Sequence, residues 1–199
     1  MLDCLVGSEM CIRDRNMDVL MVGSVAYDSV SSPAGVVQDA LGGSAVYAGI
    51  ASRFHGNYLD LDQIGLVGVV GQDFKQSDID MLKSLGLDLE GLEIADGKTF
   101  RWEGSYEGDM GIAQTHDTQL NVFADFDPKV PAHSTEPKIL FCANMIPALQ
   151  MKVIEQAKST RLSMLDSMNL WIEIAQDDLL SVMKSVDLII INDGEVRML

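Results

Sequence analysis

Five short, almost uninterrupted runs of apolar residues recur along the chain, separated by longer segments of mixed character. The runs occupy residues 19–25, 64–70, 139–143, 162–165 and 188–191. Their length and composition favour β-strands. Because apolar residues do not alternate with polar ones, we expect these strands to be covered on both faces, as in a parallel sheet flanked by helices.

Helical segments are expected between these runs. The candidates are residues 44–54, 76–85, 148–159 and 171–184. In the second candidate Ile79, Leu82 and Leu85 follow one another at helical spacing, and Gly86 is suited to end the helix. The alternation of strands and helices predicts an α/β fold with a mostly parallel central sheet.

One segment departs from this alternation. Residues 98–126 are polar, carry several aromatic side chains and contain no apolar stripe long enough for a core helix. The segment is typical of β-hairpins, and we expect a small β-rich lid around residues 96–127. An exposed strand edge invites pairing with a second copy, so the lid is also a candidate homodimer interface.

The acidic composition narrows the choice of partners. The 199 residues include 30 acidic and 14 basic side chains, a formal net charge of −16. Without a local basic patch, such a charge repels nucleic acid and anionic lipid, and we expect neither as a partner. No apolar run approaches the roughly 18 residues of a membrane span. Three cysteines without metal-ligand spacing suit a reducing compartment, so we expect a cytoplasmic protein.

The beginning of the chain reads as a detached leader. Residues 1–16 carry two of the three cysteines, and the sequence from Met17 onward is typical of a natural first strand. The leader has neither the long apolar core nor the small-residue cleavage site of a secretory signal. We therefore expect a non-native or disordered leader at 1–16 and one domain at 17–199.

Four of the apolar runs lead into a polar residue. These residues are Asp28, Asn144, Asp166 and Asn192. In open parallel sheets, ligands bind beside the carboxyl ends of the strands, so these side chains are expected along one rim. The alternative is that loops after strands are polar only because they face water.

A pair of glycines precedes the first predicted helix. Gly42 and Gly43 let the backbone approach a ligand closely, and Ser44 is placed to cap the helix. A simple tight turn is the alternative. The chain lacks a GxGxxG fingerprint, a Walker A loop and a GxSxG elbow, which disfavours a nicotinamide-binding Rossmann domain, a P-loop NTPase and an α/β-hydrolase.

Taken in order, the segments VGSVAYDSV, LGGSAVYAGIA, GLVGVVGQDF, LDSMN and NDGE resemble the N-terminal part of the PfkB, or ribokinase-like, carbohydrate kinases. The resemblance extends from Met17 to the last residue. It implies phosphotransfer from ATP, assisted by Mg²⁺, to a hydroxyl of a sugar or related polyol. It also implies that a C-terminal part with the general-base Asp and the anion hole is missing, so we assign no catalytic residue and expect this fragment to be inactive.

The same resemblance implies roles for individual residues. Substrate binding would fall to Asp28, Gly42, Gly43 and Asn144. The phosphate and magnesium region would contain Asp166, Asn169, Asn192 and Glu195, with Glu195 acting on the metal through water. Asn192 and Glu195 are also spaced as an ordinary helix-capping pair.

Two alternative functions remain open. A nucleoside kinase of the same fold would have an aromatic-lined pocket, for which Tyr47, Trp102 and Tyr106 are candidates. A non-catalytic small-molecule-binding domain would keep the sheet and lid without phosphoryl chemistry. Val46 and Tyr47 stand where sugar-specific members commonly carry an Asn, which disfavours a ribokinase. For Tyr47, packing in the core is favoured over stacking on a ligand ring.

Overall fold

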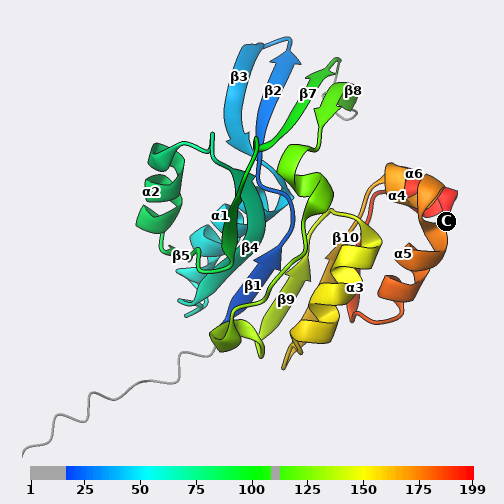
Figure 1. Cartoon of the computed structure of the whole chain (residues 1–199). Helices are drawn as coiled ribbons and strands as arrows, with labels where there is room; N and C mark the ends of the chain where they lie inside the picture. Colours follow the sequence, from blue (N-terminus) through cyan, green and yellow to red (C-terminus); the bar gives the residue numbers. More distant parts are fainter. Residues whose placement is uncertain (1–16, 109–112) are drawn as a thin grey trace, which may run out of the picture.

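A computed structural model describes residues 17–108 and 113–199 of the protein. Within these ranges the chain forms a seven-stranded sheet with helices on both faces, and a separate four-stranded sheet beyond one end (Figure 1). The leader expected at 1–16 lies outside the described residues. None of the helices described here has both the length and the apolar character that crossing a membrane requires.

The larger sheet is parallel throughout. Its strands lie in the order β11 (Leu188–Ile190), β10 (Leu162–Asp166), β9 (Ile139–Cys142), β1 (Val19–Val22), β4 (Ile64–Gly71) and β5 (Leu87–Asp88), and β6 (Leu92–Ala95) also pairs with β4. Every neighbouring pair runs in the same direction. The predicted parallel central sheet is confirmed.

Two hydrophobic cores lie on opposite faces of this sheet. The flanking helices are α1 (Ser44–Gly56), α2 (Gln76–Ser84), α3 (Pro147–Gln156), α4 (Asn169–Ile174) and α5 (Gln176–Met183). Alternate residues of β1 point to opposite faces, so Val19 and Met21 pack with α1 and α2, whereas Leu20 and Val22 pack with α3, α4 and α5. Figure 1 shows these two groups of helices on the two sides of the sheet.

Two details of the predicted elements differ. The single helix expected at 171–184 is divided at Ala175, whose ψ of 38° leaves the helical range, and α5 then begins with the acids Asp177 and Asp178. Acidic side chains suit the positive end of a new helix. Gly86 follows α2 with a positive φ of 85°, as expected for a residue that ends a helix.

Strand β11 contradicts the expectation that every apolar run is covered on both faces. Its residues Leu188, Ile189 and Ile190 are 43%, 38% and 46% exposed. Among the described residues β11 is hydrogen-bonded to β10 alone and forms the edge of the sheet. The following helix, α6 (Asp193–Met198), has no buried residue. An apolar run therefore indicated a strand but not its burial.

The smaller sheet contains more of the chain than the expected lid. It has the order β3 (Gly35–Gly42), β2 (Ala26–Ser32), β7 (Phe100–Tyr106) and β8 (Ala113–Gln119). The antiparallel β7–β8 pair is the hairpin expected within 96–127. The β2–β3 hairpin is not indicated by the sequence pattern, because apolar and polar positions do not separate clearly along these two strands. Asp28 therefore lies within a strand of the small sheet, not in a loop after β1.

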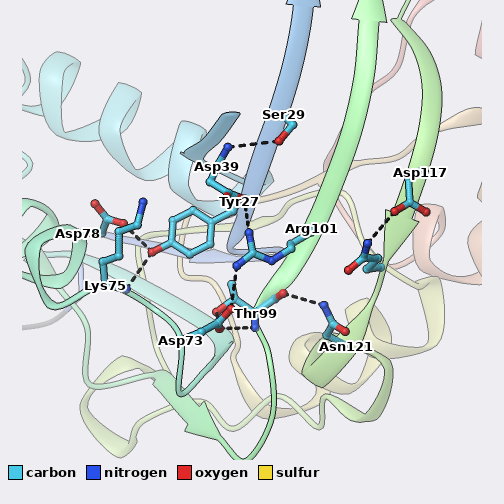
Figure 2. Close-up of polar contacts among 11 residues, drawn as sticks. Tyr27, Ser29, Asp39, Asp73, Lys75, Asp78, Thr99, Arg101, Asp117 and Asn121 are labelled. Atoms are coloured by element: carbon cyan, nitrogen blue, oxygen red, sulfur yellow. Dashed lines mark hydrogen bonds and ion pairs between the residues drawn. The ribbon is translucent and has the colours of Figure 1, made fainter. Parts of the chain in front are cut away.

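Arg101 fastens the small sheet to the segment that follows β4. Its guanidinium pairs with Asp39 of β3 and, at 2.8 Å, with Asp73 beyond the end of β4 (Figure 2). Asp73 also accepts hydrogen bonds from the backbone N–H and the hydroxyl of Thr99, each at 2.7 Å. Although partial burial raises the pKa of Asp73, the bonds from Thr99 and Arg101 hold it below its usual value. Asp73 therefore stays ionised as the counter-charge of Arg101.

Tyr27 makes a second attachment beside the first. Its ring is 1% exposed, and its hydroxyl donates to Asp78 at 2.7 Å while accepting the backbone N–H of Lys75 at 2.8 Å. The Arg101 guanidinium lies 5.3 Å and the Lys75 ammonium 4.9 Å from the ring centroid. Tyr27 pairs with Arg101 in the register of β2 and β7, so both strands are fastened to the same segment, residues 71–78.

Replacing Arg101 with glutamine is expected to loosen the small sheet selectively. We expect a loss of about 1 kcal/mol in the free energy of unfolding, because the exposed carboxylates of Asp39 and Asp73 lose their shared partner. Amide hydrogen exchange should accelerate roughly tenfold in β2 and β7 and remain unchanged in β1 and β9. The control is Arg197→Gln, which breaks an exposed ion pair with Asp193 at 3.1 Å. Uniform acceleration across both sheets would contradict the attachment.

Candidate functional site

The turn from β3 into α1 brings the backbone of two glycines to the junction of the sheets. Gly43 has φ 97° and ψ 148°, and a Cβ there would overlap the carbonyl oxygen of Ser24. Ser24 and Ser44 then bind each other reciprocally, since each backbone N–H donates to the other hydroxyl, at 3.2 and 3.0 Å. These contacts hold the start of α1 against the chain leaving β1.

The prediction that Ser44 caps α1 is wrong. Gly43 is the capping residue and makes no side-chain bond to the helix. The Ser44 hydroxyl instead donates to the carbonyl oxygen of Asn144 at 3.1 Å. Ser44 therefore joins the helix to the carboxyl end of β9, which draws Asn144 towards the glycine turn.

The carboxylate of Asp28 lies directly over Gly42. A Cβ at Gly42 would overlap the Asp28 carboxyl group, so only glycine permits this approach. The carboxylate accepts hydrogen bonds from the backbone N–H of Gly43 and, at 3.2 Å, from the hydroxyl of Tyr47. Burial raises the pKa of Asp28, and these two bonds partly oppose that increase. Asp28, Gly42 and Gly43 thus form one compact unit.

Asn144 and Asp166 connect this unit to the neighbouring strand ends. The backbone N–H of Asn144 donates to the Asp166 carboxylate, and the Asn144 side-chain oxygen accepts from the indole of Trp171 at 2.8 Å. Buried Gln150 of α3 donates to the carbonyl oxygens of Cys142, Ala143 and Asp166, at 3.3, 3.0 and 2.9 Å. The Gln150 side chain therefore joins the carboxyl ends of β9 and β10.

Asp166 has the most perturbed carboxyl group of this rim. Burial, together with the negative charge of Glu195, raises its pKa to about 6, although backbone N–H groups of Ser167 and Asn144 lower it in part. The buried Ser167 hydroxyl has no hydrogen-bond partner among the described residues. The neighbouring carboxylates of Asp166 and Glu195 offer oxygen ligands, which suit a hard divalent cation.

Asn192 and Glu195 form the helix-capping pair that their spacing predicts. The Asn192 side chain accepts the Glu195 N–H and the Glu195 carboxylate accepts the Asn192 N–H, each at 2.9 Å. One Glu195 oxygen is therefore used within the chain. Asn169 is the exposed first residue of α4, and its side chain makes no hydrogen bond to these residues in the part of the chain that the structure describes.

Tyr47 lies on the surface beside Asp28. The interpretation that it packs in the core is wrong, because its side chain is 58% exposed and its hydroxyl reaches Asp28. Its backbone N–H bonds to Gly43, which places it in the first turn of α1. The signal was present as an aromatic residue four positions after the glycine that starts the helix, at the end that faces the strand ends.

A second group of potential metal ligands lies away from the rim. The ring nitrogens of His133 contact Asp88 at 2.7 Å and Glu90 at 3.6 Å. The two carboxylates contact different ring nitrogens, so the imidazole lies between Asp88 and Glu90. The arrangement is a hydrogen-bonded clamp between the end of β5 and the turn at 132–134.

In its fold the protein belongs to the ribokinase-like α/β class, as comparison with solved structures shows. A Methanocaldococcus jannaschii nucleoside kinase, described as an archaeal member of the ribokinase family, superposes with a TM-score of 0.67 and 16% identity, covering 92% of this chain and 63% of that one. A Cryptococcus neoformans ribokinase in complex with ADP gives 0.64 and 18%, with 91% and 58% covered. A Burkholderia thailandensis nucleoside kinase in complex with inosine gives 0.65 and 15%, with 90% and 62% covered.

Sequence comparison adds no closer relative. No protein-family model matches the sequence, and no curated protein matches it significantly. The chain spans 58–63% of the length of the three solved kinases. The fold is therefore established by shape, whereas activity and substrate are matters for proposal.

Proposed function

We propose that this chain is part of an enzyme that transfers phosphate from ATP to a hydroxyl of a sugar or related polyol, and that it carries the acceptor-binding part. The observation that carries the proposal is the Asp28 carboxylate lying over the Gly42–Gly43 turn, at the junction of the two sheets. Nucleosides are the second candidate acceptor, favoured by the exposed ring of Tyr47 beside Asp28. The likeness to a ribokinase and to nucleoside kinases supports both.

The chemistry of Asp28 suits a hydroxyl-bearing acceptor. A carboxylate in partly desolvated surroundings accepts hydrogen bonds strongly, and it offers no donor of its own. A ligand that lacks the matching hydroxyl leaves the buried carboxylate underpaired, which costs binding free energy. The site therefore selects ligands by the position of their hydroxyl groups, as a polyol kinase requires.

The donor half of the proposal rests on the rim at Asp166 and Glu195. A triphosphate is repelled by a chain of net charge −16 unless a cation intervenes. The two carboxylates fit Mg²⁺, with Glu195 acting through water because one of its oxygens accepts the Asn192 N–H. When bound, Mg²⁺ neutralises charge on the phosphate oxygens. Asp166 and Glu195 would orient it beside the strand ends.

Cellular location and assembly belong to the same proposal. Three cysteines, odd in number and without metal-ligand spacing, suit a reducing compartment and so favour the cytoplasm. Homodimerisation through the small sheet is supported by its outer strand β3, on which Val36 and Val37 are 71% and 48% exposed.

Ligand binding by the chain tests the acceptor site directly. Titration calorimetry should detect binding of at least one member of a panel containing D-ribose, D-fructose, D-glucose, adenosine, inosine and cytidine. Asp28→Asn should weaken that binding at least about tenfold, because the amide offers one acceptor oxygen and no charge. The matched control is Asp117→Asn, an exposed residue on β8 of the same sheet. Equal affinity of Asp28→Asn and the unchanged chain would refute the assignment.

A further inference from the structure

Asp88, Glu90 and His133 form a compact cluster of metal-binding side chains at the end of the large sheet opposite to the rim. Asp88 is the last residue of β5 and pairs with Gly65, the second residue of β4. His133 lies in the short 3₁₀ turn Ala132–Ser134, which precedes β9. Both segments therefore lie beside the amino ends of the parallel strands, whereas the proposed acceptor and Mg²⁺ sites lie at carboxyl ends.

Local hydrogen bonds hold two of the three side chains in place. The backbone N–H of Glu90 donates to one oxygen of Asp88 at 2.9 Å, and the other Asp88 oxygen lies 2.7 Å from Nε2 of His133. The turn that carries His133 is closed by the backbone N–H of Ser134, which donates to the carbonyl oxygen of Pro131 at 2.8 Å. The Glu90 side chain is 68% exposed and free to rotate. The cluster therefore has two fixed ligands and one adjustable ligand.

The separations within the cluster suit a small divalent ion. One ligand atom from each residue lies within 4.8 Å of the other two. Ligand atoms at a tetrahedral zinc ion, with bonds of about 2.0–2.1 Å, lie roughly 3.3 Å apart. An ion bound by Nε2 of His133 therefore needs Asp88 to withdraw slightly from its contact of 2.7 Å, and Glu90 to rotate around the ring from its position 3.6 Å from Nδ1. Both movements are open to side chains that are partly or largely exposed.

The charges of the cluster favour a cation. In the part of the chain that the structure describes, the only basic partner of Asp88 or Glu90 in an ion pair is His133. A neutral imidazole leaves the two carboxylates without a counter-charge, in a chain of net charge −16. Imidazole combined with carboxylate suits zinc-like ions, whereas Mg²⁺ prefers oxygen ligands alone. The ligand set therefore selects a different ion from the one proposed for the rim.

We propose that Asp88, Glu90 and His133 form a structural binding site for a divalent transition-metal ion of the zinc type. Neutral His133 holds the ion through Nε2 and keeps its ring proton on Nδ1, and the carboxylates of Asp88 and Glu90 supply the charge. Water completes the coordination. The ion joins the turn after β5 to the turn before β9, two segments whose ligands stand 45 positions apart in the sequence. The site is independent of the proposed phosphotransfer.

Zinc binding by the full chain tests the site, in the presence of excess Mg²⁺ to occupy sites made of oxygen ligands alone. Titration calorimetry with ZnCl₂ should detect binding that Glu90→Gln weakens at least about tenfold. This variant removes one ligand and leaves the contact between Asp88 and His133 in place, so the fold is kept. In NMR spectra Zn²⁺ should shift the ring resonances of His133 and leave those of His116 unchanged.

A matched histidine variant separates this site from general zinc affinity. His116→Asn changes an exposed histidine of β8 whose ring contacts the Ser105 hydroxyl at 2.7 Å, and it should leave zinc affinity unchanged. Zn²⁺ should raise the midpoint of urea-induced unfolding for the unchanged chain but not for His133→Asn, because only a ligand bound to the folded state stabilises it. Equal zinc affinity of the unchanged chain, Glu90→Gln and His133→Asn would show an adventitious ion only and would overturn the proposal. Unshifted His133 resonances would overturn it as well.

Discussion

Replacing Gly43 with alanine is expected to destabilise the protein by at least about 3 kcal/mol. The backbone conformation at Gly43, φ 97° and ψ 148°, is almost restricted to glycine, and the added Cβ would meet the carbonyl oxygen of Ser24. The backbone must move to relieve this overlap, which breaks the paired hydrogen bonds between Ser24 and Ser44. Urea-induced unfolding followed by circular dichroism measures the effect.

Gly35→Ala provides the matched control for this prediction. Gly35 also has a positive φ, 142°, but a Cβ there would meet no atom within 4 Å. Only the backbone strain remains, so a loss of about 1–2 kcal/mol is expected. Similar losses for the two variants would show that the contact with Ser24 contributes nothing to stability.

Replacing Asp166 with asparagine is expected to stabilise the protein at neutral pH. The folded-state pKa of about 6 lies above the ordinary value of 3.8, so folding favours the protonated acid. Stability from this group is fully present below about pH 4 and is lost as the pH rises through 6. After allowance for solvent screening at this half-buried site, Asp166→Asn should raise the free energy of unfolding at pH 7 by about 1–2 kcal/mol.

The pH dependence distinguishes this effect from a general stabilisation. The gain from Asp166→Asn should vanish at pH 4, where the natural carboxyl group is already neutral. Asp187→Asn should act in the opposite direction, because hydrogen bonds from Ser163 lower the pKa of Asp187 and favour its ionised form. A gain of equal size at pH 4 and pH 7 would contradict a titrating Asp166. Addition of Mg²⁺ should raise the free energy of unfolding of the unchanged protein more than that of the Asp166→Asn variant.

The rim shows why part of the site could be predicted. Asn144 and Asp166 follow strands of a parallel sheet, and parallel strands place their carboxyl ends along one edge irrespective of separation in sequence. Because the apolar runs 139–143 and 162–165 predict strands of one parallel sheet, Asn144 and Asp166 are expected at the same edge of that sheet. The Gly42–Gly43 turn was recognisable for a related reason, since paired glycines before a helix indicate a close backbone approach.

The residues that were misjudged depend on contacts between distant segments. Ser44 was expected to cap its own helix, but the reciprocal bonds with Ser24 and the carbonyl oxygen of Asn144 compete for its hydroxyl. Tyr47 was expected in the core, but the small sheet brings Asp28 to its hydroxyl. Neither partner is visible from a local pattern.

The sequence by itself determined the class of fold, because apolar runs of strand length separated by helical segments leave few arrangements other than a parallel sheet with helices on both faces. Only the tertiary structure decided that β2 and β3 complete the small sheet, that Arg101 fastens it to residues 71–78, and that β11 is exposed. The physical reason is the distance along the chain over which the interactions act. Periodicity shows which local segments are apolar. The pairing of strands, the ion pairs and the exposure of an edge strand depend on contacts between segments that are far apart in the sequence.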